Sequence, residues 1–322
     1  MKNNQFKITF LVFFCLIMLL FPLQLLANGP IIKKPHTFSA GTPARASEVN
    51  ANFDVAYDNI QKLLNVVCKF HPTEPLCLTT EPPETWTNDI GMTFVLIQPG
   101  TFVMGSPESE AGRKTDEVQH GVTLTNAFYI QTTEVTQGQW KAIMGNNPSY
   151  FNSCGDDCPV DQISWEDAQV FIEKLNLHEN SNRYRLPTEA QWEYAARAGS
   201  TTSLANGNIE HTNCSLDTNL TAMGWYCGNA DNKTHQVAQK KPNAWGIYDM
   251  HGNLWEFCQD WYASYPTGSV TDPQGASSGS SRVLRGGSWY DVAWRSRSAN
   301  REAHSPDFRS ENFGIRLMRT IE

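Results

Sequence analysis

The stretch YDMHGNLWEF at residues 248–257 is the most informative segment of this chain. The segment RLPTEAQWEY at 185–194 precedes it, and RGGSW follows it at 285–289. Around these segments, from Ser200 to about Ser281, glycine, asparagine and aromatic residues dominate without a sustained helical or strand period. We therefore expect this part of the chain to be built from loops, which usually need disulfides or bound cations to hold them.

Together the three segments resemble the formylglycine-generating enzymes, also called the sulfatase-modifying factor family. The resemblance covers roughly residues 88 to 319. It implies an α+β domain with the C-type-lectin-like architecture of that family, rich in irregular structure.

The resemblance fails where the family performs its chemistry. Family enzymes that oxidise a target cysteine carry two copper-binding cysteines just after Gly-Gly-Ser, and Ser288 matches a serine beside the copper. Asp291 occupies the first cysteine position, the second falls near residues 294–296, and no cysteine follows Cys258. Copper(I) requires soft thiolate ligands, so copper is not expected here. Ser288 and Asp291 are the only candidates for a catalytic role in the groove.

The resemblance also implies structural calcium. Asp249, Gly252, Leu254 and Glu256 match family positions that hold the ion through two side chains and two backbone carbonyls. Calcium prefers six to eight hard oxygen ligands, and a glycine lets carbonyls and carboxylates converge. A second family site maps loosely to the pair Asn229–Ala230. The alternative is that Asp249 and Glu256 are an ordinary turn acid and a solvated acid.

A binding function is predicted for the segment after Gly-Gly-Ser, which lines the substrate groove in the family. The candidate ligand-binding residues are Trp289, Tyr290, Asp291, Trp294 and Arg295, and the expected partner is a protein or peptide. One alternative is a family oxidoreductase that modifies an exported protein or small molecule. Another is a surface protein diversified by retroelements, because residues 289–319 resemble the variable region of such proteins, with His304, Phe308 and Phe313 among the displayed positions.

The N-terminal part predicts export. Residues 1–27 have two lysines ahead of an apolar run and end in small Ala27, the pattern of a signal peptide; an uncleaved membrane anchor is the alternative. Residues 28–83 contain a helical segment and a proline-rich linker. In that segment apolar residues are spaced 4, 3, 4, 3, 4 over 49–67, after a cap at Ser47. This seam fits either a short homo-oligomeric coiled coil through residues 47–67 or a helix that packs on its own domain.

Charge and cysteines agree with a periplasmic, cell-surface or secreted protein. The net charge is −8, and removal of the two lysines in residues 1–27 makes it −10, which disfavours nucleic acid. We also expect no membrane insertion once the signal peptide is removed. In an oxidising compartment the cysteine spacing suggests the pairs 68/77, 154/158 and 214/227, although the sequence does not fix the connectivity. Cys258 is left over among aromatic residues, as a buried thiol.

Local patterns predict several elements of the domain. Residues 93–97 and 101–104 flank Pro99-Gly100 and predict a hairpin, and residues 122–130 alternate like one further strand. Three helices are predicted by capping signals, which are the pairs Thr136 with Gln139, Ser164 with Asp167, and Thr188 with Gln191.

Overall fold

The computed structural model describes residues 84–321. The predicted signal peptide, the heptad segment and the 68/77 cysteine pair lie outside these residues. In the described range, no helix is long and apolar enough to cross a membrane.

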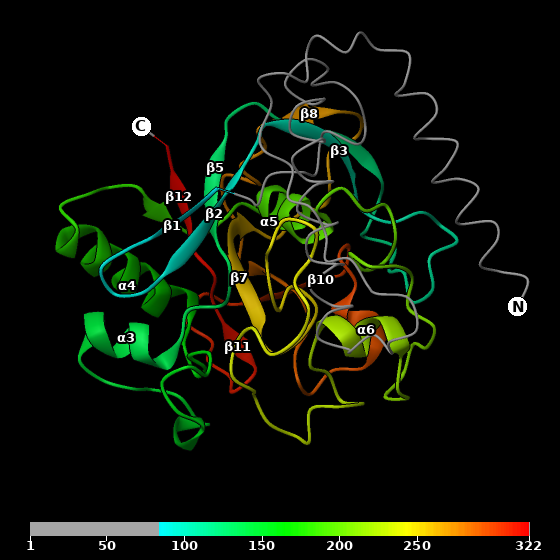
Figure 1. Ribbon diagram of the computed structural model, residues 1–322. Helices are drawn as coiled ribbons and strands as arrows, with labels where there is room; N and C mark the ends of the chain where they lie inside the picture. Colours follow the sequence, from blue (N-terminus) through cyan, green and yellow to red (C-terminus); the bar gives the residue numbers. More distant parts are fainter. Residues whose placement is uncertain (1–83, 322) are drawn as a thin grey trace, which may run out of the picture. The chain divides into compact units, whose positions relative to one another are not determined.

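The first sheet has five strands and brings the two ends of the domain together (Figure 1). Its strand order is β1 (Thr85–Thr87), β2 (Thr93–Ile97), β5 (Phe128–Gln131), β12 (Met318–Thr320) and β6 (Tyr184–Arg185). All neighbouring strands are antiparallel. The first and last strands of the described residues, β1 and β12, both belong to this sheet.

The second sheet contains parts of the segments YDMHGNLWEF and RGGSW. Its order is β10 (Arg301–His304), β9 (Arg282–Arg285), β7 (Trp255–Trp261) and β11 (Phe313–Gly314), with β11 parallel to β7. The loop prediction for residues 200–281 was wrong for β7, which is buried along most of its length. A strand buried on both faces loses the polar alternation by which sequence patterns identify strands.

The third sheet corrects the predicted hairpin. It contains β3 (Gly100–Met104), β4 (His120–Leu124) and β8 (Val270–Thr271), whereas β2 pairs in the first sheet. The strand predicted over 122–130 is also divided, because β4 and β5 belong to different sheets. Asp272 marks the break, since its carboxylate accepts the backbone N–H of Thr125 at 2.8 Å just after β4 ends.

The three predicted helices begin where their capping signals indicated. Each helix has a complete capping box, in which hydroxyl and acceptor side chains bind each other's backbone N–H groups. The helical elements are α3 (Gln137–Met144), η4 (Asn152–Cys154), α4 (Trp165–His178), α5 (Glu189–Arg197), α6 (Thr218–Met223) and η5 (Ala293–Ser296).

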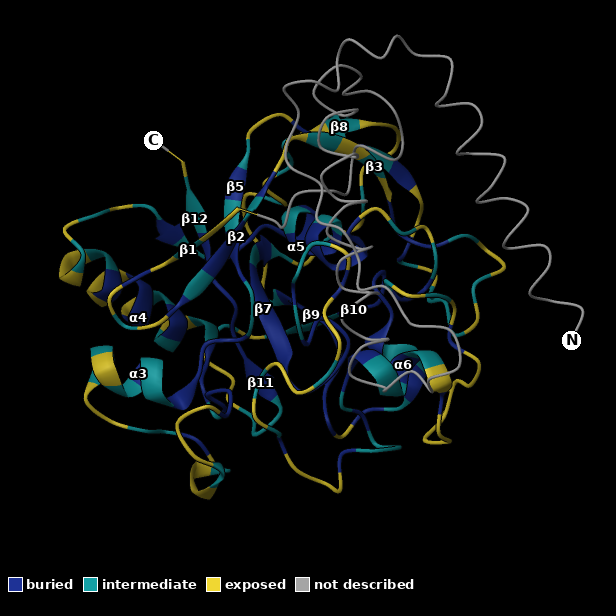
Figure 2. Cartoon of the chain, in the orientation of Figure 1, coloured by how far each residue is buried: buried dark blue, intermediate teal, exposed yellow. Residues whose placement is uncertain are grey.

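The interior lies around β7 and α5, which Figure 2 shows as dark blue. Trp255 and Phe257 of β7 face one apolar cluster with α4, while Cys258 joins a second cluster with Trp192 of α5. The remaining chain between α5 and β7 is mostly irregular, as predicted, apart from α6.

Two of the predicted disulfides are present. Cys154 is bonded to Cys158, and Cys214 is bonded to Cys227. Cys258 is a buried free thiol, and burial raises its pKa well above the usual value. It therefore remains protonated and unreactive at neutral pH.

Candidate functional site

The site begins at a tight turn after β9. Gly286 and Gly287 have φ angles of +100° and +74°, a backbone conformation that favours glycine. A Cβ atom on Gly287 would lie 2.8 Å from Ser296 Oγ, so η5 packs directly against the turn. Ser288 follows and is fully buried.

Asp291 is a buried hydrogen-bond acceptor. The Ser288 hydroxyl and the Trp255 indole N–H both donate to Asp291 Oδ2, the latter at 2.7 Å. The Cys227 N–H donates to the Asp291 carbonyl at 3.0 Å. Burial is the main reason that the pKa of Asp291 is raised. The residue at the copper-cysteine position thus attaches the turn to β7 and to the Cys214–Cys227 disulfide.

Four aromatic rings next to this turn form a continuous chain, which we call the aromatic ridge: Tyr150, Phe151, Trp289 and Tyr290. Ring centroids are 5.0 Å apart for Tyr150 and Phe151, 5.3 Å for Phe151 and Trp289, and 5.5 Å for Trp289 and Tyr290. All three contacts are edge-to-face, an arrangement that aromatic pairs prefer.

The ridge has two exposed ends, a buried Trp289 and a half-buried Phe151. Tyr150 and Tyr290 are 66% and 67% exposed, whereas Trp289 is 6% exposed. The Trp289 indole N–H donates to the Glu311 carbonyl at 3.2 Å, which satisfies its one polar group. Trp289 is therefore a support, and Tyr290 is the member of the predicted set that is free to contact a partner.

Asp161 holds the other half of the ridge. Its carboxylate accepts the Tyr150 N–H at 2.6 Å and the Phe151 N–H at 3.4 Å. Burial raises the pKa of Asp161 to about 7, despite these two hydrogen bonds. The backbone that carries two ridge residues is thus fixed by one buried carboxyl group.

Two pockets each have one ridge residue in their wall. The Trp140 pocket, of about 540 Å³, includes Tyr150 in its wall together with Trp140 and Arg309. The Trp225 pocket, of about 620 Å³, includes Phe151 together with Trp225. Both volumes lie in the range of about 300–1,000 Å³ that is usual for ligand pockets.

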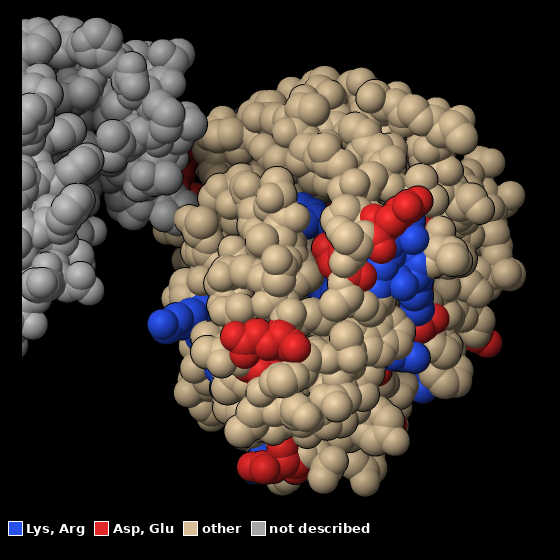
Figure 3. All heavy atoms as spheres, turned by 90° about the vertical axis from the view of Figure 1, so that its right-hand side faces the viewer, with Lys and Arg blue, Asp and Glu red and all other residues tan. Residues whose placement is uncertain are grey.

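Trp294 and Arg295 lie in a different environment from the ridge. Lys114 and Arg295 lie over the Trp294 ring, 5.5 Å and 5.1 Å from its centroid. Arg295 also pairs with Glu302 at 3.3 Å and with Asp291 at 3.6 Å. Figure 3 shows one face of the molecule, on which charges of both signs adjoin in small clusters. The structure therefore separates the predicted ligand-binding set into ridge residues and residues of an ion-paired cluster.

The positions predicted for a diversified surface are also divided. Phe308 is 45% exposed and stacks on His304, with ring centroids 4.8 Å apart. Phe313 is buried in β11 and packs edge-on against Phe257. Phe313 and Asp291 are thus part of the frame and are not displayed.

The four positions predicted for calcium surround a buried group of carboxylates. Asp249 Oδ2 accepts the Ala238 N–H at 2.7 Å, while Asp249 Oδ1 is buried without a partner. Glu134, which the sequence did not single out, accepts the Leu254 N–H at 3.2 Å. Burial, and next the charge of Asp249, raise the pKa of Glu134 well above the usual value. The orphaned oxygen of Asp249 fits a cation ligand.

Glu256 does not fit that role as it stands. The Arg316 guanidinium binds both of its carboxylate oxygens, at 2.7 Å and 3.0 Å, and the Trp192 N–H donates to one of them at 2.6 Å. In residues 84–321, no three His, Cys, Asp or Glu side chains are grouped to hold a metal ion together. A calcium ion at Asp249 would therefore depend on backbone carbonyls such as those of Gly252 and Leu254.

The atoms predicted for a second calcium are engaged within their own loop. Asn229 Oδ1 accepts the Tyr226 N–H at 2.9 Å. The Ala230 carbonyl accepts His235 Nε2 at 2.9 Å and the Lys233 N–H at 3.2 Å. These contacts give Asn229 and Ala230 a role in closing the loop.

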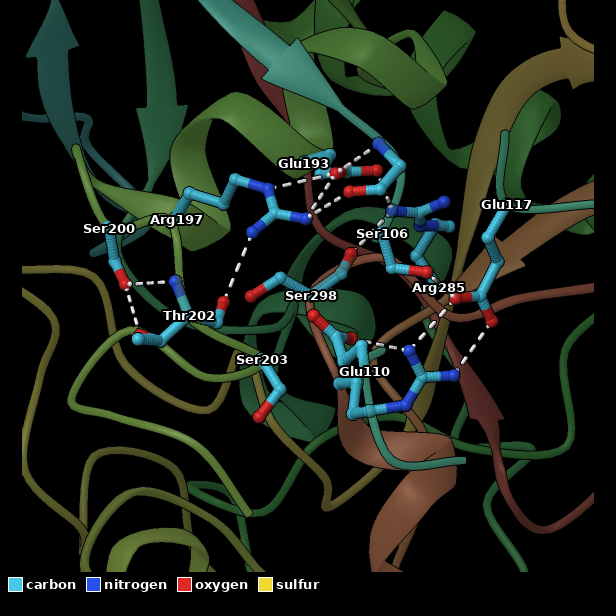
Figure 4. A network of polar contacts seen from close by, with 12 residues as sticks. Ser106, Glu110, Glu117, Glu193, Arg197, Ser200, Thr202, Ser203, Arg285 and Ser298 are labelled. Carbon is cyan, nitrogen blue, oxygen red and sulfur yellow. Dashed lines mark hydrogen bonds and ion pairs between the residues drawn. The ribbon is translucent and has the colours of Figure 1, made fainter. Parts of the chain in front are cut away.

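Buried ion pairs connect α5 to the sheet that carries the site (Figure 4). Arg285 of β9 binds Glu189 at 2.9 Å and Glu193 at 2.5 Å, and Arg197 binds Glu193 at 2.8 Å. Burial favours a neutral Glu193, but Arg197 and Arg285 together hold its pKa below the usual value. Arg301 completes the group with a 2.7 Å contact to Glu189.

Sequence reasoning missed these charges as well as Tyr150, Phe151 and Asp161. The charged residues of α5 recur at every fourth position, which places them on one helix face, but that pattern usually indicates solvent exposure. For Tyr150 and Phe151 no sequence signal pointed to Trp289, because their contact joins distant parts of the chain.

Comparison with known proteins bears on the fold and the family of the domain. Residues 80–321 match the model of the sulfatase-modifying factor enzyme 1-like domain. The chain is 30% identical over 245 residues to chaperone protein LppX of Paenibacillus barcinonensis, covering 61% of this chain and 78% of that protein. It is 32% identical over 180 residues to the formylglycine-generating enzyme of Streptomyces coelicolor, covering 49% of this chain and 51%, about half, of the enzyme.

A solved structure has a similar fold over three quarters of this chain. Treponema denticola variable protein 1 is 32% identical, with a TM-score of 0.67, and the match covers 75% of this chain and 100% of that one. The match to the family model includes the turn after β9, the capped α5 and the β7 segment, so the chain belongs to the sulfatase-modifying factor family, whose members include formylglycine-generating enzymes.

Proposed function

We propose that the domain is a protein- or peptide-binding module that captures its partner on the aromatic ridge. The observation that carries this proposal is the chain of four edge-packed rings with exposed Tyr150 and Tyr290 at its ends. Rigid aromatic side chains offer much contact area for little lost rotamer freedom. The buried Trp289 and the half-buried Phe151 between them fix the spacing of the two tyrosines before a partner arrives, which reduces the entropic cost of binding.

The environment of Asp291 supports binding over copper-dependent oxidation. Its carboxylate is committed to Ser288 and Trp255, and the sequence has no cysteine after Cys258. Among relatives, LppX is named a chaperone protein, which agrees with a function in contacting other proteins. We also propose that the protein is exported, because two disulfides are unusual in a reducing cytosol.

The test uses the full chain as bait in a random-peptide display selection, followed by variants of the ridge. Tyr150→Ala and Tyr290→Ala should each lower the affinity for the selected peptides by about tenfold or more, with little change in the melting temperature of the protein. Leu177→Ala on α4 is the matched control, because Leu177 is 73% exposed and lies off the ridge. Peptides that bind both tyrosine variants as well as wild type would refute this surface.

The oxidase alternative has its own measurement. Purified protein should contain no stoichiometric copper, and a cysteine-containing peptide should not be converted to an aldehyde. Copper binding that is lost in Cys154→Ala, together with aldehyde formation, would overturn the binding proposal in favour of an enzyme.

A further inference from the structure

The Trp225 pocket differs from the rest of this acidic chain in the chemistry of its wall. It is bounded by Phe151, Trp225, Lys233, Thr234 and His235, with the Cys154–Cys158 disulfide at one side. Within the described residues, its wall contains no carboxylate, although the chain as a whole has a net charge of −8.

Two polar groups in this wall lack partners. Trp225 Nε1 and Thr234 Oγ1 are both buried without a hydrogen bond, and Thr234 as a whole is only 1% exposed. An indole N–H can only donate, so only an acceptor can satisfy it. A buried donor without a partner is costly, and a ligand that supplies an acceptor removes that cost.

Lys240 supplies positive charge beside the indole that carries the orphaned donor, whereas burial lowers the pKa of His235 and leaves its ring neutral at pH 7. Lys240 Nζ lies over the Trp225 ring, 3.7 Å from its centroid, and the His235 ring is stacked on the same indole at 3.7 Å. Lys233 adds an ammonium group in the wall. Asp231 and Asp249 are near enough to affect the pKa of His235 and Lys240 respectively, but neither carboxylate lines the pocket.

The pocket adjoins the aromatic ridge. Phe151 belongs to both, because it lines the pocket and its ring packs edge-on against Trp289. A peptide that crosses the ridge past Phe151 would therefore bring its next side chains to the pocket entrance.

We propose that the Trp225 pocket receives an acidic side chain, Asp or Glu, of the peptide held on the aromatic ridge. The carboxylate pairs with Lys233 and accepts hydrogen bonds from Trp225 Nε1 and the Thr234 hydroxyl. This inference rests on the proposed binding function and names the chemistry of its partner: a peptide with an acidic residue beside the segment that contacts the tyrosines.

The peptides selected by display on the full chain test this directly. Asp or Glu should be enriched at one fixed position, and its replacement by Asn or Gln should weaken binding by about tenfold. Lys233→Glu should abolish the acidic preference and favour Lys or Arg at that position. Lys174→Glu, which makes the same charge change at an exposed position of α4, should leave the preference unchanged. Thr234→Val should weaken the binding of peptides with Asp or Glu at that position more than the binding of the same peptides with Asn or Gln.

The outcomes separate the two proposals. Peptides that require Tyr290 but show no acidic enrichment, and that bind Lys233→Glu as they bind wild type, would overturn the acidic pocket and leave the binding function intact. A selection that yields no peptide dependent on Tyr150 or Tyr290 would overturn the binding function itself.

Discussion

At the scale of single residues, the carboxyl group of Asp161 has the clearest energetic consequence. It is completely buried, and burial raises its pKa to about 7, with Glu311 adding a smaller effect in the same direction. An acid whose pKa is higher in the folded state stabilises the fold below its unfolded pKa, and this contribution is lost as the pH rises through the folded value. The window for Asp161 therefore runs from about pH 4 to pH 7.

Asp161→Asn should change the pH dependence of stability in a defined direction. The amide does not ionise, so the melting temperature of the variant should gain on that of wild type as the pH rises from 4 to 8. The difference in unfolding free energy between variant and wild type should change by at most about 4 kcal/mol over this range, because the folded and unfolded pKa values of Asp161 differ by roughly three units. Asp260, whose pKa is also raised to about 7, is present in both proteins, so its effect on the pH dependence of stability is the same in wild type and variant. Parallel melting profiles across this range would contradict the assignment.

Asp249 offers the sharper test of calcium binding. We expect a chelator to lower the melting temperature of wild type and calcium to restore it, because binding only to the folded state stabilises it. Asp249→Asn should remove most of this response, because the neutral amide is a weaker calcium ligand than the carboxylate with its orphaned oxygen. The amide oxygen still accepts the Ala238 N–H. Glu256→Ala is less informative, because it also leaves the buried Arg316 unpaired.

A wild-type protein whose melting temperature is the same with chelator and with calcium would exclude a structural calcium site at Asp249. In that case Arg316 would be the main counter-charge of Glu134, Asp249 and Glu256.

At the scale of elements, α5 is attached to β9 by charge as well as by apolar packing. Arg285→Met should cost about 3–5 kcal/mol of unfolding free energy, because it leaves buried carboxylates of Glu189 and Glu193 short of a partner. Arg309→Ala breaks an ion pair with Asp167 whose arginine side chain is 53% exposed, and should cost less than about 1 kcal/mol. Urea unfolding measures both without the added salt of guanidinium. Equal losses would show that burial does not govern these pairs.

The three helices with capping boxes were predictable from the sequence and the sheets were not, for a physical reason. Thr136, Ser164 and Thr188 start helices through contacts within three residues, so the signal is contained in the local sequence. The partner of β2 is β5, far along the chain, and nothing near Pro99-Gly100 reveals it. The site follows the same rule: Trp289 and Tyr290 were predicted from a local motif, whereas their neighbours Tyr150 and Phe151 depend on tertiary contacts.

At the scale of the whole molecule, the irregular chain between α5 and β7 depends on covalent and polar attachments. The Cys214–Cys227 disulfide closes a loop of 13 residues in sequence separation, and Cys227 also donates to the Asp291 carbonyl. Replacing both cysteines by serine should cost about 3 kcal/mol, mainly through a freer unfolded chain. The same change at Cys154 and Cys158, separated by 4 residues, should cost about 2 kcal/mol.

Melting temperatures of the two serine variants and of wild type, measured with and without a thiol reductant, check which disulfide contributes more to stability. Reduction should lower the melting temperature of wild type and leave that of the variant lacking both pairs unchanged. A larger loss from the short pair would mean that Cys154 and Cys158 do more than restrict the unfolded chain.

The difference between the exposed ends of the aromatic ridge and its packed middle bears on how such proteins evolve. Tyr150 and Tyr290 contribute little to the core, whereas Phe151 and Trp289 hold them at a fixed spacing. Mutations at the two ends are therefore nearly neutral for folding, and natural drift can explore new partners without first acquiring compensating stability. A library randomised at positions 150 and 290 should consist mostly of soluble, folded members, while one randomised at 151 and 289 should be depleted of them.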